Sequence, residues 1–392
     1  MRPSVRLWPI LLFALVCSGA VEGNQLARAL EAGNNGVQFL EGGLTGLYQS
    51  ALEASEDTGN YEIDLIGSIV LRQADGETVG STDFVFWAFH VDNLGNLQST
   101  GKLAQKAGLL WDTNDINVDN SVTQFGVFGL RQFFLNDRLD LGIGKLFPGM
   151  IHTESAYTAN NSETYTTKII SASAVGGYFE AIGLGANLKY WGNSWFVQGG
   201  FSDAKAESEF DFSSLADGVL AWTGEAGWAP RQLGGDTAVS LLVFRVDQTP
   251  TLDKQTGWAL AGTHDFGESR RYGIFGRYTR ASGGEGRGQE NADAALPLKS
   301  AAYLGFAFNR PLGRVNDQLG LAALYGQPTE YRESQGFSSQ YGVEAFWKIG
   351  ISRIFRITPS LQLLRNREDE VEYVIGIRAK IAADFAQYFK RR

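Results

Sequence analysis

Charged and amide side chains recur at alternate positions within short apolar stretches of this sequence. Glu344, for example, is flanked by Val343 and Ala345. In an extended strand this spacing places the polar groups on one face and the apolar groups on the other. Arg, Glu, Gln and Asn groups exchange weak hydrogen bonds with hydroxyl-bearing solutes. The alternative role for any such residue is to solvate the wall or to pair with a neighbour. The same alternation selects eight candidate binding residues: Arg277, Glu344, Glu225, Arg131, Asp140, Asn187, Gln198 and Arg378.

Residues that usually carry catalysis or hold metals are scarce. The chain has 3 His and 1 Cys. A His-Thr-Glu-Ser run at 152–155 joins a base, an acid and a hydroxyl, but working triads take their members from separate segments. The Gly-rich run 283–288 lacks the strand and helix that a phosphate-binding loop needs. We therefore expect no enzyme, no metal site and no cofactor.

The elements that must position the eight candidates are strands. Almost nothing after residue 40 has helical periodicity, and alternation of apolar and polar residues predominates. In 371–381 the apolar residues Tyr373, Ile375 and Ile377 alternate with Arg378 and Lys380 on the other face. The pattern predicts sixteen strands, at 44–52, 61–72, 81–90, 121–134, 138–147, 181–190, 194–203, 217–228, 236–246, 255–264, 271–281, 299–309, 317–325, 338–348, 354–363 and 371–381.

The connections between the predicted strands tend to alternate between short and long. Asn136-Asp137 and Gly192-Asn193 make two of the short ones, whereas 91–120, 148–180, 204–216 and 282–298 are long. Short turns on one side and long loops on the other are typical of outer-membrane barrels, as are strands of about ten residues. A soluble sandwich shares the periodicity but has only about seven to nine strands. The sequence therefore predicts an all-β, 16-stranded antiparallel transmembrane β-barrel, with both chain ends on the periplasmic, short-turn side.

The N-terminus has the pattern of an export signal. Arg2 and Arg6 precede an apolar run of about ten residues, and Ser18-Gly19-Ala20 supplies the small residues of a cleavage site after Ala20. We divide the chain into a signal peptide (1–20), a periplasmic segment (21–43) with a short helix at 25–32, the barrel (44–385) and a C-terminal tail (386–392). The segment containing the helix precedes the first strand, so the helix either caps the pore mouth or packs on the surface.

Composition agrees with this class of protein. The chain has 48 Gly, 9 Pro and 12% aromatic residues, and one Cys excludes a disulfide scaffold. Loss of Arg2 and Arg6 leaves 32 basic against 43 acidic residues, so the formal charge of −9 becomes −11. This acidic balance argues against nucleic acid as a partner. Aromatic pairs near the strand ends, namely Trp87 with Phe89, Tyr190 with Trp191 and Phe346 with Trp347, suggest interfacial girdles.

Short motifs in order along the chain resemble the carbohydrate-selective porin family of Gram-negative outer membranes, the OprB type. The motifs include Gly-Ile-Phe-Gly-Arg-Tyr at 273–278, the Pro-Leu-Gly-Arg-Val-Asn-Asp-Gln-Leu-Gly run at 311–320, and Ile-Thr-Pro-Ser-Leu-Gln at 357–362. Glu344 with Phe346 and Trp347, and the strand at 195–200, fit the same pattern. The segment 365–370 replaces the Asn-Pro that usually follows the Leu-Gln strand in this family.

The resemblance implies a passive pore for mono- or oligosaccharides, with charged residues at its constriction. Arg277 and Glu344 match the family pattern as well as the parity rule. Trp111 and Tyr157, in long loops, are further candidates, either stacking on a sugar ring or packing within their own loops. The alternatives are a general, weakly cation-preferring porin and, far behind, an outer-membrane barrel enzyme.

The expected location and partners follow from this class. The chain is expected in the outer membrane of a Gram-negative bacterium, in contact with outer-membrane lipid and lipopolysaccharide. It is expected to meet the barrel-insertion machinery during biogenesis, and sugars are its expected solutes. Both a homotrimer and a monomer are compatible with the sequence.

Overall fold

The computed structural model describes residues 36–385 apart from 75–77, 96, 98, 115, 117–120, 147–151, 153–156, 159–163, 172–182, 206–214, 231–236, 268–269, 285 and 287–296. The described residues form sixteen strands and three short helices. The strands are β1 (Gly36–Ala51), β2 (Glu56–Arg72), β3 (Val79–Asn93), β4 (Val122–Phe134), β5 (Leu139–Leu146), β6 (Gly183–Trp191), β7 (Trp195–Asp203), β8 (Leu220–Trp228), β9 (Ala238–Val246), β10 (Gln255–Phe266), β11 (Tyr272–Gly283), β12 (Leu298–Asn309), β13 (Gln318–Pro328), β14 (Gln340–Gly350), β15 (Phe355–Arg365) and β16 (Val371–Asp384). The helices are α3 (Thr100–Lys106), α4 (Lys168–Ser171) and α6 (Glu330–Ser334).

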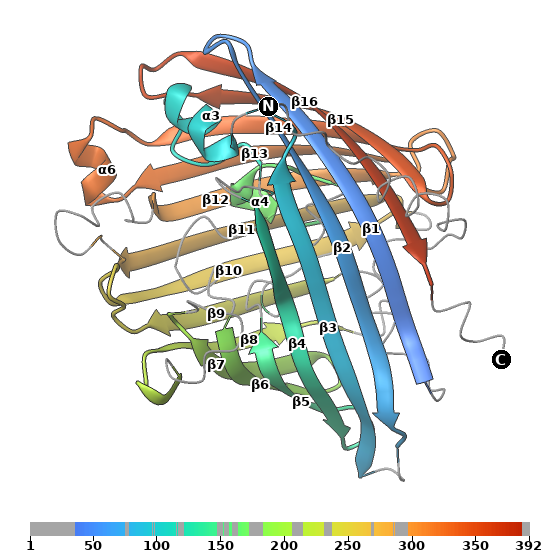
Figure 1. The fold of residues 1–392 in the computed structure, drawn as a ribbon. Coiled ribbons are helices and arrows are strands. Elements are labelled where there is room, and N and C mark those ends of the chain that lie inside the picture. The colour runs from blue at the N-terminus through green and yellow to red at the C-terminus, as the bar shows by residue number, and fades with distance from the viewer. Residues whose placement is uncertain are drawn as a thin grey trace, which may run out of the picture.

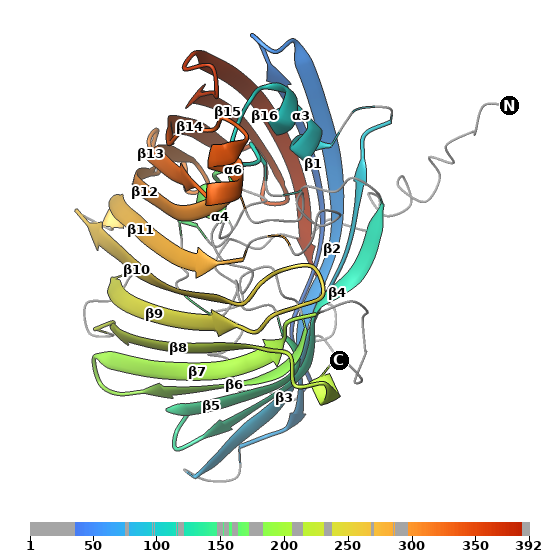
Figure 2. The same cartoon turned by 90° about the vertical axis from the view of Figure 1, so that its left-hand side faces the viewer.

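The strands close into one barrel (Figures 1 and 2). Each strand pairs antiparallel with its neighbours in sequence, and β1 pairs with β16 through register partners such as Leu44 and Ile381. Closure leaves no strand edge with unpaired backbone groups, which is what a sheet surrounded by lipid requires. The predicted fold class is confirmed. Among the described residues, no helix is long and apolar enough to cross a membrane.

The first strand starts earlier than the sequence predicted. It begins at Gly36, where Gly36 pairs with Val70 of β2, and not at residue 44. The stretch contains Gly42 and Gly43, which weaken a strand signal in the sequence. Main-chain pairing with β2 and β16 overrides that low propensity. The predicted signal peptide (1–20), the helix at 25–32 and the tail (386–392) lie outside the described residues.

Alternation decides which side chains face outward. In β9, Val239, Leu241 and Val243 are about half exposed on the outer surface, while Leu242 between them is completely buried. Likewise Ile375 and Ile377 of β16 face outward, and Arg378 and Lys380 face inward. The apolar residues therefore lie on the outer surface, as in a barrel surrounded by lipid.

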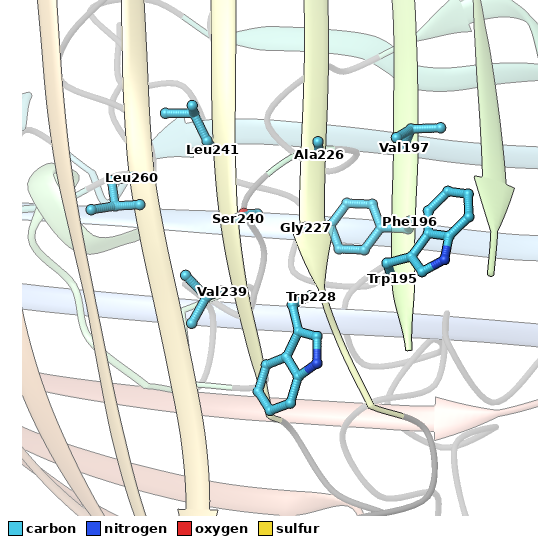
Figure 3. A pocket seen from close by; sticks show the side chains of 10 residues that line it. All are labelled: Trp195, Phe196, Val197, Ala226, Gly227, Trp228, Val239, Ser240, Leu241 and Leu260. Atoms are coloured by element: carbon cyan, nitrogen blue, oxygen red, sulfur yellow. The ribbon is translucent and has the colours of Figure 1, made fainter. Parts of the chain in front are cut away.

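Figure 3 shows a shallow apolar groove on this outer surface. Ala226 of β8 forms a low point between Val197 of β7 and Leu241 of β9. Trp195 and Trp228 lie beside it, near the short-turn ends of β7 and β8. Exposed tryptophans at a strand end suit the interface between hydrocarbon and lipid headgroups.

The predicted girdle pairs are wrong in part, because adjacent residues of a strand face opposite sides. Phe346 is 4% exposed and packs against a ring inside the barrel, so only Trp347 of that pair faces outward. In β3, Ala88 pairs with Leu65, which is exposed on the outer surface, so Ala88 also faces outward. Its two neighbours in the strand, Trp87 and Phe89, therefore both face inward. The same rule turns Trp191 inward and Tyr190 outward, since they pair with Phe196 and Val197.

The barrel interior is not uniformly polar. Inward residues of β1 and of β8 to β16 form a buried apolar cluster with side chains of the long connections. Leu242, Phe244 and Phe275 supply the wall, and Leu103, Trp111 and Tyr165 come from the connections. This cluster explains why β9 is apolar on both faces: one face meets the outer surface and the other packs against inward-folded chain.

Candidate functional site

Two long connections fold into the barrel. The described part of the β5–β6 connection includes α4, which lies within the ring of strands (Figure 1), and His152 and Tyr157, which contact inward side chains of β8 and β11. The β3–β4 connection carries α3 and continues to Trp111 and Thr113, which are 2% and 0% exposed. The side chains that hold these segments come from β1, β7, β8, β11, β14 and β15. The interior site is therefore an assembly of two connections and the inward faces of the strands.

Glu344 of β14 holds the β5–β6 connection. Its side chain is fully buried, and its Oε1 accepts hydrogen bonds from the Thr166 backbone N–H (2.7 Å) and the Thr166 hydroxyl (2.9 Å). Its Oε2 accepts from the Thr167 N–H at 3.1 Å. Arg378 of β16, 1% exposed, is close enough for its charge to act on this carboxylate. Glu344 thus binds backbone and lies away from any open surface.

Two glutamines connect the β3–β4 and β5–β6 connections. Gln362 of β15 donates to the Thr113 carbonyl at 2.8 Å and to the Thr166 hydroxyl oxygen at 2.6 Å. Gln49 of β1 also donates to the Thr113 carbonyl, at 3.0 Å, and accepts from the Thr113 hydroxyl at 3.0 Å. Both glutamines are fully buried. Alternation in the sequence places these two glutamines on inward faces, but it does the same for many other residues. Only the tertiary contacts identify them as the residues that hold the two connections.

Aromatic packing reinforces these hydrogen bonds. The Tyr165 ring packs edge-on against Phe346 (4.6 Å between centroids) and Phe275 (5.5 Å). Its hydroxyl donates to the Phe306 carbonyl at 3.2 Å. Burial, and then the negative charge of Glu344, raise the pKa of Tyr165 well above the usual value for a tyrosine. The Tyr165 hydroxyl therefore stays neutral as a buried donor.

The two loop candidates are buried. The Tyr157 ring stacks on Phe275 at 5.3 Å, its hydroxyl bonds to Asp265, and it is 4% exposed. Trp111 packs over Gly326, where a Cβ would lie 2.7 Å from the indole ring. Both rings pack against the barrel wall. Neither ring therefore has a free face on which a sugar could stack, and neither packs only within its own loop.

A second anchor lies at β7 and β8. His152 of the β5–β6 connection is 1% exposed, with its Nδ1 3.0 Å from Glu225 Oε2 and its Nε2 3.1 Å from the Thr223 hydroxyl. Gln198 of β7 lies 2.8 Å from Nδ1 and also bonds to Glu225. Two of the eight strand candidates, Glu225 and Gln198, are thus occupied by a histidine of the connection.

Arg277 of β11 is half-buried on the interior face. Its Nη2 donates to the Ile169 carbonyl of α4 at 3.1 Å, and its guanidinium lies 5.2 Å from the Tyr303 ring centroid. Arg277 therefore links the barrel wall to the inward connection from a half-buried position.

Two of the remaining candidates, Arg131 and Asp140, lie near the short turn between β4 and β5. Arg131 of β4 pairs with Asp140 of β5, its Nε 2.8 Å from both carboxylate oxygens, and stacks over Phe133 at 4.7 Å. Asn187 of β6 is half-buried beside Gly200. All eight strand candidates face inward, but the structure does not gather them into one cluster.

Sequence reasoning missed a further interior contact at Gly43 of β1. The Asp64 Oδ2 and the Lys380 Cε lie 3.3 and 3.8 Å from where a Gly43 Cβ would be. Trp87 donates to Asp64 at 3.0 Å. The signal in the sequence that could have indicated this contact is a glycine in a strand whose two neighbouring strands carry inward charged residues. Among the described residues, no group of three His, Cys, Asp or Glu side chains forms a metal site.

Known porins are similar to this chain in sequence and in fold. No family model matches the sequence. The chain is 26% identical over 324 residues to Porin AaxA of Chlamydia pneumoniae, covering 77% of this chain and 67% of that protein.

Two solved structures extend the comparison. A high-pH structure of Pseudomonas putida OprB superposes with a TM-score of 0.70 and 12% identity, covering 92% of this chain and 96% of that one. A loop-deletion mutant of Vibrio cholerae OmpT gives a TM-score of 0.52 and 11% identity, covering 88% and 98%. At such identities the superpositions establish the fold. The chain is a barrel of the outer-membrane porin type that resembles OprB in fold as well as in its sequence motifs.

Proposed function

We propose that this protein is an outer-membrane porin that forms a passive diffusion channel for mono- or oligosaccharides. The observation that carries the proposal is the combination of an apolar outer surface with an interior bearing Arg277, Arg131, Asp140 and Asn187. Such donors and acceptors replace the water around a sugar at small net cost, provided that each contact is weak. The similarity to OprB and to a second porin supports the same class.

The proposed orientation puts the short turns and both chain ends in the periplasm and the long connections outside. The first twenty residues are the proposed export signal. Sugars are the proposed solutes, lipopolysaccharide the outer-leaflet neighbour, and the barrel-insertion machinery the partner during biogenesis. Both a homotrimer and a monomer fit the proposal.

A general porin is the second candidate function. The formal charge of −11 after signal removal favours cations over anions in an unselective pore. In that case sugars would pass no better than other neutral solutes of the same size. The interior ion pair of Arg131 and Asp140 would then only solvate the wall.

Planar-bilayer conductance tests both. The purified protein is expected to form ion-conducting pores whose current is reduced by glucose or maltose more than by size-matched neutral solutes that are not sugars. Equal effects of sugars and controls would leave the general porin. Absence of any conducting pore would contradict both candidates.

A further inference from the structure

We propose that the short turns after β10, β12 and β14 form a binding surface for anionic phospholipid headgroups. This surface, called here the basic arc, comprises the described residues 267, 270–271, 310–317 and 351–354. The proposal rests on the membrane orientation given under the proposed function, in which these turns meet the inner leaflet. It concerns the outside of the barrel and is independent of what passes through it.

The basic arc is rich in arginine. It carries Arg270, Arg271, Arg310, Arg314 and Arg353, all exposed, against Glu268 and Asp317 in the sequence. Asp317 is 2% exposed, accepts a hydrogen bond from the Gly350 N–H at 3.0 Å and lies 3.4 Å from Arg314, so its charge offsets that of Arg314 and leaves the other four arginines against Glu268. The whole chain is acidic, which makes this local excess of positive charge a departure from its average.

Apolar side chains stand among these arginines. Leu312, Val315 and Ile351 are 67%, 58% and 55% exposed at the tips of their turns. Such side chains gain free energy when they leave water, whereas the arginines keep their charged ends in a polar layer. A lipid headgroup region provides both environments within a few ångströms. An acidic soluble protein would satisfy the charge without needing three isolated aliphatic tips.

The turns lie where the headgroups would be. Just inside the turns, the Tyr272 ring packs on Phe306 and Phe308, with ring centroids 5.9 and 5.2 Å away. Arg271 stacks over Phe308 at 5.0 Å. Figure 1 shows β10 to β15 as consecutive strands of the wall, so their turns follow one arc of the rim. Aromatic residues followed outward by arginine mark the passage from hydrocarbon to headgroup.

A guanidinium group binds the phosphate of an anionic phospholipid through paired N–H donors. Arg270 and Arg310 occupy left-handed turn positions, with φ of 55° and 57°. Arg314 is used within the protein, donating to the Gly350 carbonyl and lying 3.4 Å from Asp317. Arg270, Arg310 and Arg353 are therefore the residues of the arc that we expect to meet phosphate.

Native mass spectrometry of the detergent-purified protein with phosphatidylglycerol or phosphatidylcholine of equal chain length tests the proposal. The native protein is expected to retain phosphatidylglycerol preferentially, and the preference should fall about tenfold or more in the triple variant Arg270→Gln, Arg310→Gln, Arg353→Gln. The matched control is Arg280→Gln, Arg365→Gln, Arg367→Gln, which removes the same charge from exposed positions at the opposite end of the barrel. A second variant, Leu312→Ser with Val315→Ser, should weaken retention of both lipids.

Two results would overturn the proposal: no preference for phosphatidylglycerol in the native protein, or an equal loss in the matched control. Single-channel conductance of the same samples separates this question from the proposed function. The triple variant is expected to conduct like the native protein. Failure of the lipid result with normal conductance would therefore reject the basic arc and leave the porin proposal standing.

Discussion

Glu344 is the position at which the structure makes its sharpest prediction. The substitution Glu344→Gln keeps the size of the side chain but replaces one carboxylate oxygen by an NH₂ group. The remaining oxygen can still accept from the Thr166 N–H and hydroxyl. The Thr167 N–H, now 3.1 Å from a donor, loses its acceptor in a fully buried place.

The cost follows from these contacts. A hydrogen bond to a charged group contributes about 1.5–3 kcal/mol, and a buried donor left without an acceptor costs about 1–3 kcal/mol. The two estimates describe the same lost contact, so we take about 2–3 kcal/mol in total. Each 1.4 kcal/mol is a factor of ten. The ratio of detached to seated β5–β6 connection should therefore rise by about 30- to 140-fold.

Single-channel recording measures this change. The Glu344→Gln variant is expected to show frequent current fluctuations and a higher mean conductance, because the connection leaves the interior more often. The barrel should stay folded, as judged by its heat-dependent mobility in gel electrophoresis, because strand pairing is untouched. Glu330→Gln, on the exposed helix α6, is the matched control and should behave like the native protein. Conductance and noise identical to the native values would refute the role of Glu344 as the anchor.

Three further predictions concern the same interior. Arg277→Ala should weaken sugar block by roughly fivefold, the loss of one hydrogen bond, with a smaller effect on open conductance; a larger effect on conductance than on block would remove Arg277 from the solute path. His152→Ala takes one partner from the buried Glu225 and should increase current noise, whereas His264→Ala, at an exposed site, should not; equal noise in both would contradict the second anchor. The raised pKa of Tyr165 means that the folded protein keeps this proton while the unfolded chain loses it above about pH 10. Stability of the seated connection should therefore be complete below that pH and fall as the pH rises further, and Tyr165→Phe should abolish this alkaline loss in noise recordings; an unchanged alkaline response in Tyr165→Phe would exclude Tyr165 as its source.

Much of the fold was predictable because strand alternation is local. All sixteen strands stand where the sequence placed them, with most boundaries shifted by a few residues. The exceptions have tertiary causes. β1 extends back to Gly36 because pairing with β2 compensates for its glycines. Trp87 and Phe89 face inward because register with β2 turns them there, although their composition suggested a girdle.

The interior site was predictable only as a set of inward positions. Parity correctly turned all eight strand candidates inward. It could not separate Arg277, which is half-buried, from Glu344, which is fully buried under the Thr166 and Thr167 backbone. Nor did it indicate Gln49 and Gln362, whose partners lie in two different connections.

The sequence by itself determined the number and order of the strands and the facing of most of their polar residues, because these depend on neighbouring residues along one strand. The tertiary structure decided which inward groups hold the connections and which remain for solute. Glu344 and Thr166 are 178 positions apart, and His152 and Glu225 are 73 apart. Such contacts depend on how two long connections fold back into a closed barrel, and no local period records that path.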